Sequence, residues 1–186
     1  MARKISWPGL GDEQLLLAVA NTAHGERDEF ADARSVRAWW RGLGAPAATR
    51  GRPEDPENVA KLRTLRLLIR GLALRNNGID TDLSETAGLD GLALRLDLRG
   101  APSLRADVPG DLAGDIGAAT VAALLRATAR PDWPRVKACR GDDCRWVFVD
   151  GSRNTSRRWC AMAECGNRAK MATFRSRHRT SPQSPV

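Results

Sequence analysis

The sequence contains no long hydrophobic run. No stretch of its 186 residues approaches the roughly eighteen consecutive apolar residues that a membrane-spanning helix needs. Residues Met1 to Trp7 also lead into no apolar stretch of the length that a secretory signal peptide requires. We therefore expect a soluble, cytoplasmic protein that does not engage a membrane.

Histidine and cysteine are scarce outside one short segment. Residues 1–130 contain one histidine, His24, no cysteine and no glycine-rich phosphate-binding loop. Catalytic sites are usually built from clusters of such groups, and several acidic residues stand at expected helix starts, where capping explains them. The sequence therefore predicts that the protein is not an enzyme, with an uncharacterised activity in the N-terminal core as the weaker alternative.

All four cysteines fall in one segment, as Cys139, Cys144, Cys160 and Cys165, with the spacing C-x4-C-x15-C-x4-C. Two close pairs on separate tight turns allow four thiolates to surround one Zn²⁺ at about 2.3 Å. Four protein ligands leave no position for water, so the spacing favours a structural zinc over a catalytic one. Free redox-active thiols and two disulfides are the alternatives, and disulfides would require an oxidising compartment.

Positive charge is concentrated in the same segment. Residues 133–186 hold 12 Lys and Arg against 4 Asp and Glu, whereas residues 1–132 hold 18 of each, so the C-terminal part carries the whole net charge of +8. Four thiolates around Zn²⁺ would carry a charge of about −2. Part of the basic excess is therefore expected to neutralise the metal site, with Arg140, Arg145 and Arg168 as candidates.

Helical periodicity dominates the N-terminal part. Capping residues and apolar spacing of i, i+3 and i+4 predict helices that begin near Asp12, Asp32, Pro56 and Asp111. The period changes to two at 92–98 and again at 104–108, which predicts a pair of facing strands. The tetrapeptide 131–134, which contains two prolines, then predicts a short stiff hinge at a domain boundary.

The fold class predicted is α+β. A mostly helical N-terminal domain with a β-hairpin (residues 1–132) is expected to precede a small treble-clef-like zinc finger (133–180) and a disordered tail (181–186). In the finger, residues 145–150 read as a strand that pairs with 135–137, and a helix is expected from about Gly166 to His178. The apolar residues of that helix are expected to pack on the strand. They are Met171, Phe174 and His178, and their expected partners are Trp146 and Phe148.

The cysteine segment resembles the CGNR zinc finger, which is named for the tetrapeptide that stands here as Cys165 to Arg168. The likeness extends over Trp146 to Asp150 and the Arg-Arg-Trp run before Cys160. The preceding residues resemble, more loosely, the ABATE domain, through Asn21-Thr22 and the Trp39-Trp40 pair. The resemblance implies a bacterial transcription regulator with a DNA-binding finger and an N-terminal sensing or regulatory domain.

A basic surface on the finger is the candidate nucleic-acid interface, because arginine and lysine side chains bind phosphates and sometimes base edges. The candidate residues are Arg153, Arg157, Arg158, Arg168, Lys170, Arg175, Arg177 and Arg179. The alternative is a solvated basic face on a zinc-stabilised protein-interaction adaptor. We therefore expect DNA as the partner.

Asn21 and Thr22 form the polar pair that we nominate for a pocket holding a small-molecule effector. The competing interpretation is that these side chains cap a helix end or satisfy backbone groups. In either case the pair follows directly after the apolar run of the first helix.

Overall fold

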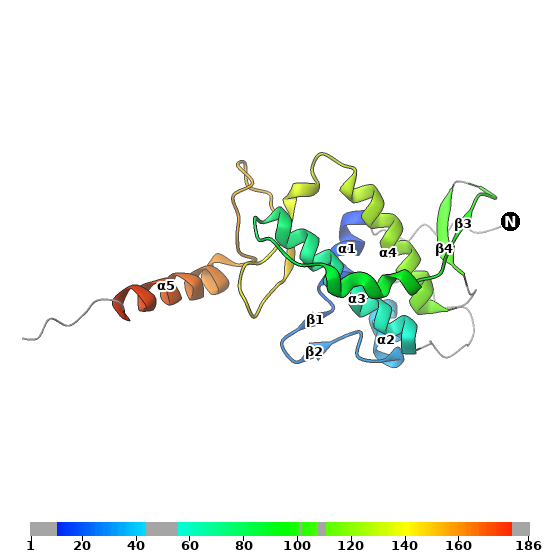
Figure 1. Cartoon of the computed structure of the whole chain (residues 1–186), viewed down its shortest axis with the longest axis horizontal. Coiled ribbons are helices and arrows are strands. Elements are labelled where there is room, and N and C mark those ends of the chain that lie inside the picture. Colours follow the sequence, from blue (N-terminus) through cyan, green and yellow to red (C-terminus); the bar gives the residue numbers. More distant parts are fainter. Residues whose placement is uncertain (1–10, 44–55, 101, 108–110, 180–186) are drawn as a thin grey trace, which may run out of the picture.

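The structure is a computed structural model that describes residues 11–43, 56–100, 102–107 and 111–179 (Figure 1). It is mostly helical with small hairpins, and a cluster of four cysteines lies beside the last hairpin, so the predicted fold class is confirmed. The expected disordered tail, 181–186, lies outside the described residues. Within the described residues, no helix is long and apolar enough to cross a membrane.

Three helices form the centre of the N-terminal part: α1 (Asp12–Ala20), α3 (Pro56–Asn76) and α4 (Leu112–Thr128). Their apolar faces meet in one core, in which Leu16, Leu62, Ile69 and Ile116 are fully buried. Burial of such side chains is worth about 1.5–3 kcal/mol each, which is the main force that holds the helices together.

Aspartate side chains cap the starts of α2 (Ala33–Gly42) and α4, whereas the N-cap of α1 is Gly11 and the expected cap, Asp12, lies in the first turn. The side chain of Asp32 accepts a hydrogen bond of 2.7 Å from the Ser35 amide and starts α2. The side chain of Asp111 accepts one of 3.2 Å from the Ala113 amide and starts α4. Gly78 follows α3 with a φ of 73°, a left-handed conformation in which glycine is favoured.

The described strands pair as three antiparallel hairpins. The first joins β1 (Ala23–His24) to β2 (Arg27–Asp28). The second joins β3 (Leu94–Asp97) to β4 (Ser103–Ala106) and lies at the end of the molecule away from the cysteines (Figure 1). The third joins β5 (Val136–Ala138) to β6 (Val147–Val149) and leads into the cysteine cluster. Short helical segments complete the order of elements: 3-10 helices η1 (Ser84–Gly91) and η2 (Trp133–Arg135), and the π-helix η3 (Met162–Gly166).

The hydrophobic core is continuous from the helices into the third hairpin. Val136, Ala138 and Val147 are buried in the same cluster as Leu62 and Ile69, although η2 separates these residues from α4 along the chain. Both faces of β5 are covered, because all three of its residues are buried. The first half of the finger is therefore anchored in the core of the helical part.

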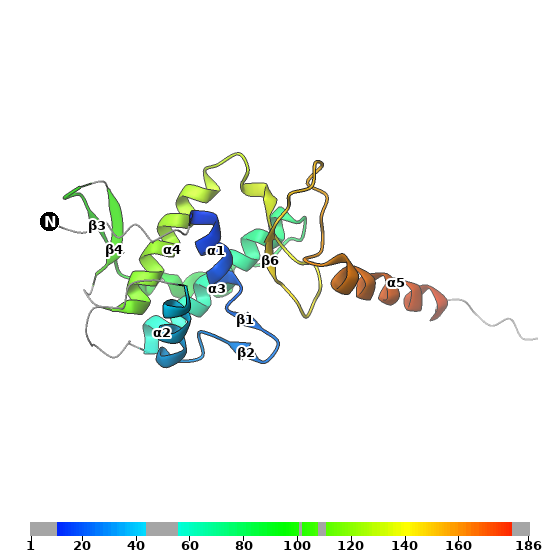
Figure 2. The same ribbon diagram turned by 180° about the vertical axis from the view of Figure 1, so that it is seen from behind.

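The last helix, α5 (Asn167–Arg179), extends away from the rest of the ribbon in both views (Figures 1 and 2). Met171 and Phe174 are 55% and 58% exposed, so the expectation that they pack on Trp146 and Phe148 was wrong. The strand side chains have other partners: Phe148 packs against the cysteines, and Trp146 lies edge-on to the His24 ring at 5.5 Å. The third helix residue expected there, His178, has a side chain outside the described part of the structure.

Candidate metal centre and nucleic-acid interface

The four cysteine sulfurs converge on one point. All four Sγ atoms lie within 4.8 Å of one another, and the pairs Cys144–Cys160 and Cys160–Cys165 are separated by 3.5 and 3.7 Å. Tetrahedral ligands at the usual Zn–S distance are about 3.8 Å apart, whereas bonded sulfurs are about 2.05 Å apart. The cysteines are free thiols, and their arrangement fits one Zn²⁺ ion.

The first cysteine pair sits on a tight turn that continues β5. The Cys139 amide donates to the Trp146 carbonyl at 2.8 Å, which closes the hairpin next to the ligand. The Gly141 amide then points at the Cys139 Sγ at 3.5 Å, and the Cys144 amide donates to the Gly141 carbonyl at 3.1 Å. Arg145 follows with a φ of 54°, the left-handed conformation that turns the chain back into β6.

The second pair ends in η3, where Cys165 is buried directly before α5. Arg168 reaches back one turn and donates to the Cys165 Sγ at 3.1 Å. Arg140 and Arg145, which we also expected near the metal, have other partners: Arg140 donates to the Asn77 carbonyl at 2.8 Å, and Arg145 lies 3.5 Å from Asp142.

The thiols have different proton affinities. Burial raises the pKa of Cys144 and of Cys160. Burial acts in the same direction on Cys165, but hydrogen bonds from Arg168 and from the neighbouring thiols outweigh it, so the pKa of that thiol is lowered. Zn²⁺ bound by these residues would displace the remaining thiol protons, because thiolates are the form that binds zinc.

The rest of the Cys165–Arg168 tetrapeptide shapes the turn. A Cβ on Gly166 would lie 2.4 Å from the Sδ of Met162, so glycine allows this close approach. The Asn167 side chain donates to the Ala163 carbonyl at 3.0 Å and closes the turn before the helix. Each member of the tetrapeptide thus has a physical role. Cys165 is a candidate metal ligand, and Gly166 allows the close contact with Met162. Asn167 closes the turn, and Arg168 donates a hydrogen bond to the Cys165 sulfur.

Three asparagines join the finger to the helices. At the end of α3, the Asn77 side chain donates to the carbonyls of Ala138 and Arg158, at 2.7 and 2.9 Å. The preceding Asn76 donates to the carbonyls of Trp133 and Val136, at 3.0 and 2.9 Å. The chain segments leading to both cysteine pairs are therefore held by one helix end.

The third asparagine is Asn21, from the pair that we nominated for a ligand pocket. Its side chain donates to the Val147 carbonyl at 2.9 Å and accepts from the Val147 amide at 2.8 Å, as a neighbouring strand would. Thr22 donates to the Val19 carbonyl at 2.8 Å and receives a bond from Arg66 at 3.3 Å. Both side chains thus satisfy polar groups of the protein itself.

An open cavity of about 990 Å³ lies beside Asn21, lined mainly by α1, the β1–β2 hairpin and α2, with Trp146 contributed by the finger. Its walls include Leu43 and Trp39 from the α2 region, His24 from β1 and Trp146 from the finger. Asn21 lines this cavity, whereas Thr22 is buried and is not among its lining residues.

Sequence reasoning missed the role of Asp150. This carboxylate is fully buried and accepts hydrogen bonds from Lys137 Nζ at 2.8 Å, from the amide and hydroxyl of Ser152 at 2.9 and 2.6 Å, and from the Arg157 amide at 2.9 Å. Burial raises its pKa, but these hydrogen bonds outweigh burial and hold the pKa well below the ordinary value. Asp150 therefore fixes the loop that carries the predicted basic residues, and an Asp before Gly-Ser at a strand end is the turn signal that could have revealed it.

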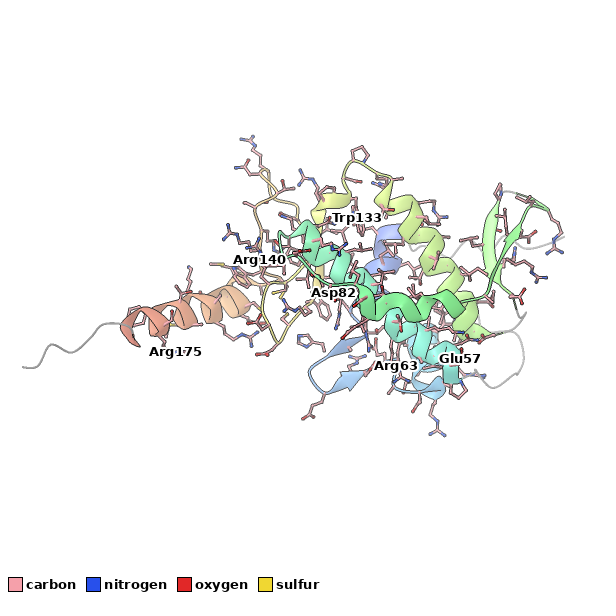
Figure 3. The ribbon with its side chains drawn as sticks, viewed as in Figure 1. Glu57, Arg63, Asp82, Trp133, Arg140 and Arg175 are labelled. Carbon is pink, nitrogen blue, oxygen red and sulfur yellow. The ribbon has the colours of Figure 1, made fainter. Side chains whose placement is uncertain are left out.

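The predicted nucleic-acid residues divide into two groups. Arg157 donates to the Trp159 carbonyl at 2.9 Å and stacks on the Phe148 ring at 4.6 Å, and Arg168 is bound to sulfur, so both have structural partners. All six described candidates are exposed, and the other four are Arg153, Arg158, Lys170 and Arg175. Figure 3 shows Arg175 on α5, well apart from Arg140 at the junction with α3. Arg177 and Arg179 belong to α5, but their side chains lie outside the described part.

Residues 135–178 match the CGNR zinc finger family. The match covers the third hairpin, both cysteine pairs and most of α5, so the C-terminal part of the chain is a CGNR zinc finger with a four-cysteine site. No curated protein matches the chain.

Proposed function

We propose that the protein is a DNA-binding transcription regulator whose zinc finger supplies the nucleic-acid surface. The observation that carries this proposal is the charge of the finger: Arg153, Arg158, Lys170 and Arg175 are exposed. From Cys165 to the end of the chain the sequence contains no Asp or Glu. A surface of this kind attracts phosphate backbones through the release of counterions.

Zinc has a structural role in this proposal. When bound, the ion holds the two cysteine turns together and so fixes the loop and helix that carry the basic residues. The residues that would hold it are Cys139, Cys144, Cys160 and Cys165, whose sulfur positions fit a tetrahedral ion. Binding, not catalysis, is the function that we assign to the finger.

The test is the salt dependence of binding to a fluorescent DNA duplex of mixed sequence, measured by anisotropy with the zinc-loaded full chain. If four exposed cations contact phosphates, log K falls against log salt with a slope of about −3 to −4. Replacement of Lys170 or Arg175 by Ala lowers the magnitude of the slope by about 0.9 each. Arg95→Ala, at an exposed position of strand β3 at the other end of the molecule, is the matched control and leaves the slope unchanged. Binding that does not respond to salt would contradict the proposal.

A second candidate function is a protein-interaction adaptor, which is favoured by the exposed Met162, Met171 and Phe174 on the finger. Competition separates the two candidates. If poly-glutamate displaces the duplex at a comparable concentration of charges, the finger recognises acidic polymers in general and the adaptor is favoured. If a much higher concentration of poly-glutamate charges than of DNA phosphates is needed to displace the duplex, the regulator is favoured.

For the helical part, we propose the regulatory role that an ABATE-like domain implies. The cavity whose walls include Trp39 and Trp146 supports this role, because a molecule seated there would touch the helical part and also one side chain of the finger. A thermal-shift screen against small metabolites tests the idea. A hit that is lost in Trp39→Ala would support an effector site, and the absence of any stabilising compound would favour a purely structural domain.

A further inference from the structure

Solvent reaches α5 on every side. Its described side chains, from Asn167 to Ser176, are exposed apart from the half-buried Ala169. With 13 residues the helix is about 20 Å long, and isolated helices of this length are marginal in water. Such a helix gains stability when it docks on a partner, and its surface indicates which partner that is.

The exposed side chains of α5 are segregated by type around the helix axis. At about 100° per residue, Met171 and Phe174 lie within about 60° of each other and form an apolar ridge. Lys170 and Arg175 lie about 70° to either side of that ridge on the same count. Small side chains, such as Thr173, occupy the opposite side of the helix. The helix therefore presents an apolar centre between two cationic borders.

We propose that α5 inserts into the major groove of B-form DNA, with Met171 and Phe174 facing the base edges and Lys170 and Arg175 facing the phosphates on either side. This inference rests on the proposed DNA-binding function and specifies how that function is carried out. An α-helix with its side chains is about 10–12 Å across, and the major groove is about 12 Å wide. The minor groove, about 6 Å wide, does not admit a helix, and the major groove of A-form RNA is too narrow for side chains to read.

Charge favours DNA over a second copy of the chain as the occupant of this ridge. Two α5 helices that paired through Met171 and Phe174 would bring Lys170 and Arg175 of both copies together. The C-terminal 22 residues contain no Asp or Glu to compensate that charge. In the DNA groove the same cations face phosphates, so apolar and electrostatic contacts are satisfied together.

The apolar ridge also predicts a sequence preference. The exposed C5-methyl group of thymine is the apolar feature of the major groove, and side chains without hydrogen-bonding groups contact it. We therefore infer that duplexes rich in A·T pairs bind more tightly than G·C-rich duplexes of the same length. The hydrogen bond from Arg168 to the Cys165 Sγ ties the first turn of the helix to the metal site, which orients the ridge.

The experiment measures binding of the zinc-loaded full chain to three samples of one duplex. The first is unmodified. In the second, glucosylated 5-hydroxymethylcytosine fills the major groove, and in the third, netropsin occupies the minor groove of the unmodified duplex. We expect the glucosylated duplex to bind at least tenfold more weakly and netropsin to have little effect. Equal binding to the glucosylated duplex, or displacement of the protein by netropsin, would overturn the inference and leave the proposed DNA binding intact. If neither duplex nor single-stranded DNA binds, the proposed function fails as well.

A double variant, Met171→Ala with Phe174→Ala, tests the ridge itself. Alanine is the best helix former, and both side chains are more than half exposed, so the fold should be retained, as circular dichroism can check. We expect roughly tenfold weaker binding to the A·T-rich duplex with an unchanged salt slope. Thr173→Ala, on the opposite side of α5, is the control and should bind as the unaltered protein does. A double variant that binds as tightly as the control would overturn the inference.

Discussion

Replacement of Asn21 by Ala tests whether the finger is held to the helices by side-chain hydrogen bonds. The Asn21 side chain makes two bonds to Val147, at 2.9 and 2.8 Å, from the end of α1 to β6. Val147 is fully buried, so in the variant its amide and carbonyl lose the partners that the Asn21 side chain supplies. An unsatisfied buried polar group costs about 1–3 kcal/mol, so we expect the free energy of unfolding to fall by about 2–4 kcal/mol.

Thermal unfolding of the zinc-loaded chain measures this effect. For a chain of this size, each kcal/mol lowers the Tm by about 2–4 °C, so the expected shift is roughly 5–15 °C. Asn21→Asp should give an intermediate loss, because its carboxylate accepts from the Val147 amide but repels the carbonyl. Asn154→Ala, at an exposed position in the loop after β6, is the control and should change the stability by less than about 0.5 kcal/mol.

The result that would refute this reasoning is an Asn21→Ala variant with an unchanged Tm. The side chain would then contribute nothing to the junction, and its place on the cavity wall would be its remaining role. In that case, loss of a stabilising ligand in the variant would identify Asn21 as a ligand-binding residue.

Three further predictions concern the finger. Cys160→Ser removes one ligand and should abolish stoichiometric zinc binding by metal analysis while the far-ultraviolet signal of the helical part is retained; retained zinc would contradict the four-sulfur site. Asp150→Asn breaks a buried ion pair with Lys137 and should cost about 3–5 kcal/mol at neutral pH. Because the native pKa of Asp150 is lowered, its stabilisation is complete above the ordinary carboxyl pKa near 4 and is lost as the pH falls through the native value, so the difference between the two proteins in denaturant unfolding should shrink in acid; a constant difference would show that the charge is not responsible. Treatment with a chelator should slow and weaken duplex binding in the mobility-shift assay, and added Zn²⁺ should restore it, whereas binding that is insensitive to the chelator would separate the metal from the nucleic-acid surface.

Much of the fold follows from local signals in the sequence. Apolar periodicity predicted that helices begin near Asp32 and Asp111, and the side chains of these residues accept amide hydrogen bonds at the starts of α2 and α4. The alternation of Leu94 and Leu96 with polar residues gives the β3–β4 hairpin, in register with Ala106 and Leu104. Capping side chains and apolar periodicity involve residues only a few positions apart, so both can be recognised from the sequence alone.

The spacing of the cysteines was sufficient to predict their convergence, because a tetrahedral metal site imposes a strict geometry on the chain. The partners of the neighbouring arginines were not predictable in this way. Arg140 lies beside a ligand in sequence, but its guanidinium binds the Asn77 carbonyl, 63 residues away along the chain. Local proximity to the metal did not determine where the side chain points.

Contacts between distant parts of the chain account for the remaining differences. The apolar residues of α5 do fall at helical spacing. The residues expected to pack on them, Trp146 and Phe148, instead contact His24 and the cysteine cluster. The bonds from Asn21 and Asn77 to the finger span 126 and 61 residues, respectively. No local pattern reports such pairs, because any exposed or half-buried asparagine has the same sequence signature.

Ala138 and Cys139 are adjacent in the chain, and this adjacency has a mechanical consequence. Ala138 is fully buried in the core that the helices share with the third hairpin, and Cys139 is a candidate ligand of the metal. A single peptide bond therefore joins the two environments, with no spacer that could absorb a displacement. Loading or stripping the ion should consequently alter hydrogen exchange at the carboxyl end of α3, where Asn77 donates to the Ala138 carbonyl across a sequence separation of 61 residues.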